Sequence, residues 1–112
     1  MERFNIERFE YLCIQTDGDG GYDCYGCNSK DEVFQVLTDR IHNQIEWLEG
    51  PDSDWFECNS HIPEYMTFTN MIKSMPIIKN PEIIHECYEQ FSANGWGFYV
   101  IRDDGSLWFG WY

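Results

Sequence analysis

Two pairs of metal-binding side chains form the sharpest chemical pattern in the sequence. Cys24 and Cys27 are separated by two residues, and Cys58 and His61 repeat that spacing further along the chain. Thiolate and imidazole ligands paired in this way on tight turns are typical of tetrahedral zinc sites. The pattern favours a zinc-stabilised interaction module as one hypothesis. Two unrelated pairs are the alternative, because a helix of about 30 Å would separate them.

A row of acidic residues is the second pattern. Glu32, Asp39 and Glu46 are seven residues apart, so a helix would place them on one side. The row continues at the end of that helix and directly after it, with Glu49, Asp52, Asp54 and Glu57, and the aromatic Trp55 within this stretch could anchor a partner. Such a row can bind an arginine- and lysine-lined groove that normally holds a phosphate backbone. A solvated helix face that maintains solubility is the alternative.

Motifs of catalysis are missing from the sequence. His42, His61 and His85 stand in no recognisable motif, and neither a P-loop, a Gly-x-Ser-x-Gly elbow nor a Gly-x-Gly-x-x-Gly loop occurs. Paired carboxylates for acid-base chemistry cannot be chosen from 20 acidic residues by sequence alone. We therefore expect binding and no enzymatic activity, and keep an enzyme as the less favoured alternative.

Charge limits the partners of the chain. Seven basic and 20 acidic residues give a formal net charge of −13 over 112 residues. Thirteen acids against two bases give −11 between Glu10 and Glu64, whereas Tyr65 to Tyr112 amounts to only −2. Direct binding to nucleic acid or to an anionic membrane would oppose like charges, so the expected partner is a protein with a basic surface.

Five cysteines, an odd number, occur without an export signal or an apolar stretch that could span a membrane. A disulfide framework is a poor explanation for them, so we expect reduced thiols in a cytoplasmic protein. The length suits a single domain, residues 1–112.

The elements that must position these residues follow from the local patterns. Arg8 to Thr16 is rich in aromatic and branched residues and predicts a strand, and the glycines after it predict a turn into a second strand near Tyr22 to Cys27. Ser29 and Glu32 predict a capping box that opens a helix from Lys30 to Glu49. Its apolar positions recur every three or four residues: Val33, Leu37, Ile41, Ile45 and Leu48.

The second half predicts two further helices and a hairpin. A loop from Asp52 to His61 precedes a helix from Pro63 to Pro76, whose start could also be a short strand. Asn80 and Pro81 predict the start of a third helix, which Asn94-Gly95 would end. The terminal hairpin pairs Trp96 to Arg102 with Ser106 to Tyr112. A two-residue turn would place Val100 opposite Phe109, Phe98 opposite Trp111 and Ile101 opposite Trp108.

Together these patterns predict an α+β fold in which a small antiparallel sheet from the two hairpins packs with about three helices. The aromatic residues exceed what a core of this size needs, so some of them would be exposed unless helices cover both faces of the sheet. In charge and size the chain resembles small acidic proteins that block nucleic-acid-binding or toxin proteins. These include phage anti-defence inhibitors, nucleic-acid mimics and immunity proteins. The resemblance is one of composition and not of motif, and it implies an inhibitor or adaptor.

Overall fold

A computed structural model describes residues 9–17, 19–91 and 96–111 of the chain. Two strands precede a block of four helices and two strands follow it. In order, the elements are β1 (Tyr11–Asp17), β2 (Tyr22–Cys27), α1 (Lys30–Leu48), α2 (Trp55–Asn59), α3 (Pro63–Ser74), α4 (Pro81–Phe91), β3 (Trp96–Arg102) and β4 (Leu107–Trp111). None of these helices is long and apolar enough to cross a membrane.

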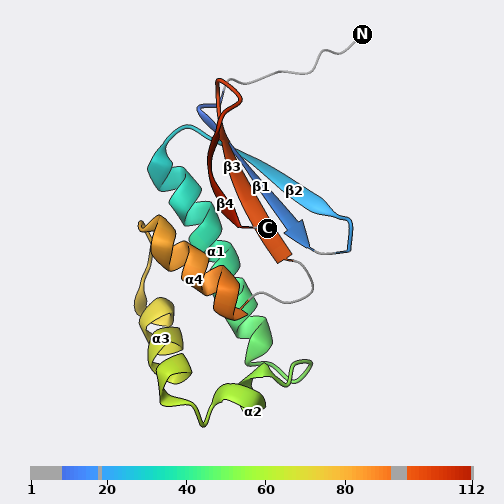
Figure 1. Cartoon of the computed structure of the whole chain (residues 1–112), viewed down its shortest axis with the longest axis vertical. Helices are drawn as coiled ribbons and strands as arrows, with labels where there is room; N and C mark the ends of the chain where they lie inside the picture. The colour runs from blue at the N-terminus through green and yellow to red at the C-terminus, as the bar shows by residue number, and fades with distance from the viewer. Residues whose placement is uncertain (1–8, 18, 92–95, 112) are drawn as a thin grey trace.

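The strands form one antiparallel sheet with the order β2-β1-β3-β4 (Figure 1). Each hairpin supplies one outer strand and one central strand, and β1 pairs with β3 along its whole length, from Tyr11 opposite Arg102 to Asp17 opposite Trp96. The predicted α+β fold with an N-terminal and a C-terminal hairpin is therefore confirmed. The first strand was predicted to begin at Arg8, which lies outside the described residues.

The two faces of the sheet differ in what covers them. In Figure 1 the sheet stands at the upper right, and α1 and α4, which contact it, run together along its left side. Side chains that alternate toward these helices are buried, among them Cys13, Phe98 and Val100. Leu12 and Leu107, which point the other way, are exposed. Helices α1 and α4 therefore cover the same face of the sheet, and they do not form the predicted alternative in which helices cover both faces.

Helix α1 is the main scaffold of the molecule. The Ser29 hydroxyl accepts a hydrogen bond from the Glu32 backbone N–H at 3.1 Å, as predicted for a capping box. The Glu32 carboxylate, however, accepts from the backbone N–H of Asn28 at 2.7 Å, one residue before the predicted donor. The predicted apolar stripe is buried, with Phe34 and Thr38 beside it: Val33, Leu37, Ile41, Ile45 and Leu48.

Helices α4 and α3 pack against α1. Helix α4 buries an apolar stripe, which consists of Ile84, Cys87, Tyr88 and Phe91. Helix α3 forms in place of the alternative strand, and Lys73 near its end forms an ion pair with Glu49 beyond α1. The predicted end of the third helix at Asn94-Gly95 lies outside the described residues.

The segment predicted as a loop from Asp52 to His61 contains the short helix α2. Its first residue, Trp55, stacks edge-on against Phe91 with 5.6 Å between ring centroids, and its indole N–H donates to the backbone carbonyl of Gln90 at 3.3 Å. A five-residue helix is marginal alone, so these contacts with α4 hold it. They are contacts between distant residues, which a local pattern does not reveal.

The C-terminal hairpin has a bulge that the sequence did not predict. Phe98 lies opposite Trp111 and Val100 opposite Phe109, as expected, but Ile101 lies opposite Leu107 instead of Trp108. The turn uses three residues and ends at Gly105, whose φ of 87° suits a glycine. The register therefore shifts by one residue. Both Trp108 and Phe109 then reach Phe34 on α1, at 5.5 and 6.2 Å between ring centroids.

Candidate functional site

An exposed tryptophan on the last turns of α1 is the centre of the candidate site. Trp47 is 49% exposed and borders three neighbouring hollows of about 630, 700 and 360 Å³. Six exposed acidic residues line these hollows with it, and we call the set the Trp47 surface: Asp17, Asp39, Glu46, Asp52, Asp54 and Glu57. The arrangement places an aromatic ring of α1 among carboxylates that come from α1, from the end of β1 and from the segment after α1.

Arg40 is the basic residue within the described lining of these hollows, and its guanidinium is directed into the fold. It donates to the side-chain oxygen of Gln15 at 2.9 Å and to the backbone carbonyl of Thr16 at 2.7 Å. The guanidinium also lies over the ring of Trp96, 4.7 Å from its centroid. Arg40 thus fastens α1 to β1 and β3 and does not pair with the carboxylates of the Trp47 surface through any hydrogen bond among the described residues.

The predicted partner-binding residues separate into two groups in the structure. Asp39, Glu46, Asp52, Asp54 and Glu57 come together on the Trp47 surface. Asp39 also accepts a hydrogen bond from the side chain of Gln35, at 2.8 Å, one turn earlier on α1. The predicted seven-residue spacing along the helix therefore brings Asp39 and Glu46 to one surface.

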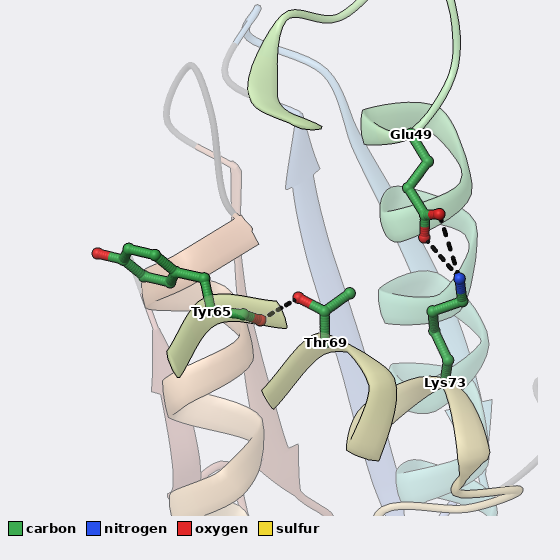
Figure 2. A network of polar contacts seen from close by, with 4 residues as sticks. All are labelled: Glu49, Tyr65, Thr69 and Lys73. Carbon is green, nitrogen blue, oxygen red and sulfur yellow. Dashed lines mark hydrogen bonds and ion pairs between the residues drawn. The ribbon is translucent and has the colours of Figure 1, made fainter. Parts of the chain in front are cut away.

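Glu32, Glu49 and Trp55 have other surroundings. Glu32 caps the start of α1, about 21 Å along the helix axis from Glu46. Figure 2 shows Glu49 bound to Lys73 of α3, with 2.9 Å between the carboxylate and the ammonium. In the same view the hydroxyl of Thr69 donates to the backbone carbonyl of Tyr65 within α3 at 2.7 Å. Trp55 contributes to the second hollow, but its indole N–H is used within the fold.

The predicted zinc ligands do not come together. Cys24 and Cys27 lie three residues apart on the extended strand β2, which directs their side chains to opposite faces of the sheet. Cys58 in α2 and His61 just after it lie beyond the far end of α1, which is about 28 Å long. The chain after α1 does not return to β2, because Trp55 ties α2 to α4. Within residues 9–17, 19–91 and 96–111, no three metal-ligating side chains gather.

The thiols are free and differ in exposure. Cys24 and Cys58 are exposed, whereas Cys13, Cys27 and Cys87 are buried. Burial raises the pKa of Cys13 and of Cys87 from 9.0 to about 12. Burial, and then the charge of Glu32, also raises the pKa of Cys27. A thiol that resists ionisation is a poor nucleophile, and the burial of these three cysteines is typical of small core residues.

The histidines are engaged in packing or stand apart from other reactive groups. His42 donates from Nε2 to the backbone carbonyl of Ile72 at 3.0 Å, which joins α1 to α3. The ring of His85 lies against aromatic rings of the C-terminal hairpin, the nearest being Trp111 at 5.9 Å between centroids. His61 is exposed after α2. His42 and His85 therefore have structural contacts, and no contact of a described histidine with a cysteine or serine side chain accompanies them.

Sequence reasoning missed the contribution of the first hairpin to the candidate site. Asp17 ends β1 and Tyr25 lies in β2, and both line the same hollow as Asp39 and Trp47. The sequence indicated only a turn at Asp17, whose carboxylate does accept from the backbone N–H groups of Asp19 and Gly21. Which turn of α1 faces the hairpin depends on tertiary packing, for which the sequence gives no local signal.

Comparisons with known proteins identify no relative: no family model matches the chain, and no curated protein or solved structure is detectably similar to it.

Proposed function

We propose that this chain is a small protein-binding inhibitor or adaptor whose Trp47 surface occupies a basic groove on a target protein. The groove would be one that binds nucleic acid in the target's own activity. One observation carries the proposal: an exposed tryptophan borders three acid-lined hollows, and Arg40 beside it is turned into the fold.

Charge and aromatic contact would contribute differently to such a complex. Lysine and arginine side chains in a groove attract anions from solution. Carboxylates that take the place of these anions release them, and this release favours binding. This contribution falls steeply with salt, because a higher ion concentration reduces the free energy gained by releasing ions. Salt also screens the attraction between charges, with a Debye length of about 8 Å at physiological ionic strength. The Trp47 ring adds a contact that salt affects less, since an arginine can stack on its face. Affinity would thus depend on both the carboxylates and Trp47.

The structure offers less support for the two alternatives. A zinc-stabilised module would need Cys24, Cys27, Cys58 and His61 in one place, and they lie at the two ends of α1. An enzyme would need an activated side chain in a substrate-sized site. The hollow that contains His42 also holds Glu49 and Lys73, which are paired with each other. We therefore favour binding over catalysis.

Capture of the target from the native host at two salt concentrations tests the proposal. The immobilised chain should retain a nucleic-acid-binding protein at 50 mM salt and release most of it at 300 mM. An excess of duplex DNA should compete with the immobilised chain for that protein. Retention that is indifferent to both salt and DNA would overturn the proposal.

A matched pair of triple variants identifies the responsible surface. Asp39→Asn, Glu46→Gln and Asp52→Asn together remove three charges from the Trp47 surface and should abolish capture. Glu10→Gln, Glu89→Gln and Asp103→Asn remove three charges from exposed positions elsewhere and should leave capture intact. Equal loss in both triple variants would assign the binding to net charge and not to the Trp47 surface.

A further inference from the structure

The face of the sheet that points away from α1 and α4 has an unusual composition. Residues directly opposite each other in an antiparallel sheet share a face, so the side chains of this face follow from the register. We call it the open face, and it comprises Leu12, Ile14, Thr16, Tyr22, Cys24, Gly26, Gly97, Tyr99, Ile101, Leu107 and Gly110. None of these described positions is charged, although 24% of the residues in the chain are charged.

The open face is apolar and accessible. Leu12 is 36% exposed, Leu107 49% and Tyr22 70%, while Ile14 and Ile101 between them are half-buried. The exposed ring of Phe9 extends this surface over β2, because it occupies the space where a Cβ of Gly26 would stand. Contiguous apolar surface of this kind marks an interaction site more often than scattered exposed residues do.

Charge determines which occupant fits the open face. Each copy of the chain carries a formal charge of −13, so two copies repel wherever their carboxylates would meet. The Trp47 surface lies on the helix side of the sheet, away from the open face. Two copies joined through their open faces would bring together described positions that carry no charge, and would keep both Trp47 surfaces outside. A self-complementary apolar face is also what a two-fold symmetric dimer requires.

We infer that two copies of this chain associate through their open faces. Four strands spaced about 4.8 Å apart, with about six residues each at about 3.4 Å, cover roughly 20 by 20 Å. Side-chain relief makes the accessible area larger than this footprint, so a dimer would bury about 1,000 Å² in total, near the lower limit of specific interfaces. An interface of this size is typical of reversible association, and we expect a dissociation constant of micromolar order. This inference does not depend on the proposed function.

Sedimentation velocity of the full chain tests the dimer. Concentrations between 1 and 500 µM suit a dissociation constant of roughly micromolar order. The weight-average mass should rise from that of a monomer toward twice that value. Raising the salt concentration should leave the association unchanged or strengthen it, because it screens the residual repulsion. A monomer at every concentration would overturn the inference, and so would association that salt abolishes.

Matched double variants place the contact. Leu12→Lys with Leu107→Lys should weaken association at least tenfold, because lysines would face each other across the interface. Phe56→Lys with Met71→Lys adds the same charge at residues 40% and 42% exposed on α2 and α3, and should leave association unchanged. If the first pair unfolds the protein, Tyr22→Lys gives the same test at a more exposed position. Association that only the control pair disrupts would contradict the inference.

A chain that begins at Phe9 distinguishes between two candidate occupants of the open face, a second copy of the chain and residues 1–8. The truncated and full chains should associate with similar affinity. If the full chain is monomeric and the truncated chain forms dimers, residues 1–8 occupy the open face and the inference is wrong.

Discussion

Replacement of Arg40 tests how the scaffold holds the candidate site. Its guanidinium makes two hydrogen bonds, to Gln15 and Thr16, and lies over Trp96. A hydrogen bond from a charged donor contributes about 1.5 to 3 kcal/mol, and a cation–π contact about 0.5 to 1 kcal/mol. Because Arg40 is half-buried, we use the lower part of these ranges. We expect Arg40→Ala to reduce the free energy of unfolding by about 3 kcal/mol.

Urea and thermal denaturation measure this loss. For a chain of this size, about 3 kcal/mol corresponds to a decrease in melting temperature of roughly 10 to 15 °C. Arg40→Lys keeps the charge but cannot make both hydrogen bonds and the stacking contact, so it should lose about half as much.

Lys79→Ala is the matched control, because it removes the same charge. Lys79 is exposed and lies 3.5 Å from Asp31, a surface ion pair whose loss should cost well under about 1 kcal/mol. If Arg40→Ala destabilises the chain no more than Lys79→Ala does, the guanidinium is not part of the fold. It would then be free to neutralise the Trp47 surface, and the account of that surface would be wrong.

The cysteines give two more predictions. A thiol reagent at pH 8 should react rapidly with Cys24 and Cys58 and reach the other three thiols only after unfolding, so rapid reaction of three or more would contradict the burial described here. Burial raises the pKa of Cys13 and Cys87 from 9.0 to about 12, so the folded state keeps protons that the unfolded state releases above pH 9. Their contribution to stability is complete below pH 9 and should fall by about 3 kcal/mol by pH 10, as chemical denaturation across pH would show. The Cys13→Ala, Cys87→Ala double variant should show a clearly smaller decrease, because Cys27 is then the one buried thiol left among the described cysteines. An unchanged decrease would refute its cause.

Much of the fold could be predicted because the signals are local. The capping serine and the apolar repeat of α1 lie within one continuous segment, as do the proline and the apolar stripe of α4. The two hairpins have turn residues between β-rich segments. Such signals specify an element without reference to the rest of the chain.

What the sequence did not predict depends on contacts between distant segments. Helix α2 is held by the contacts of Trp55 with α4, and the bulge beside Ile101 allows two successive aromatic residues to reach Phe34. The predicted zinc ligands also depend on distant segments, since Cys58 and His61 lie beyond the far end of α1 from Cys24 and Cys27 on β2. At the candidate site, the seven-residue spacing of Asp39 and Glu46 predicted that they share one side of α1. No local pattern predicted that Asp17 would line the same hollow as Asp39.

The dependence of target affinity on salt tests the Trp47 surface most directly. With the captured target purified, its dissociation constant for the chain should be measured between 50 and 300 mM salt, for the unaltered chain and for the Asp39→Asn, Glu46→Gln, Asp52→Asn variant. We predict a steep loss of affinity with salt for the unaltered chain and a clearly shallower slope for the variant. Equal slopes, or an affinity that salt does not change, would contradict the account.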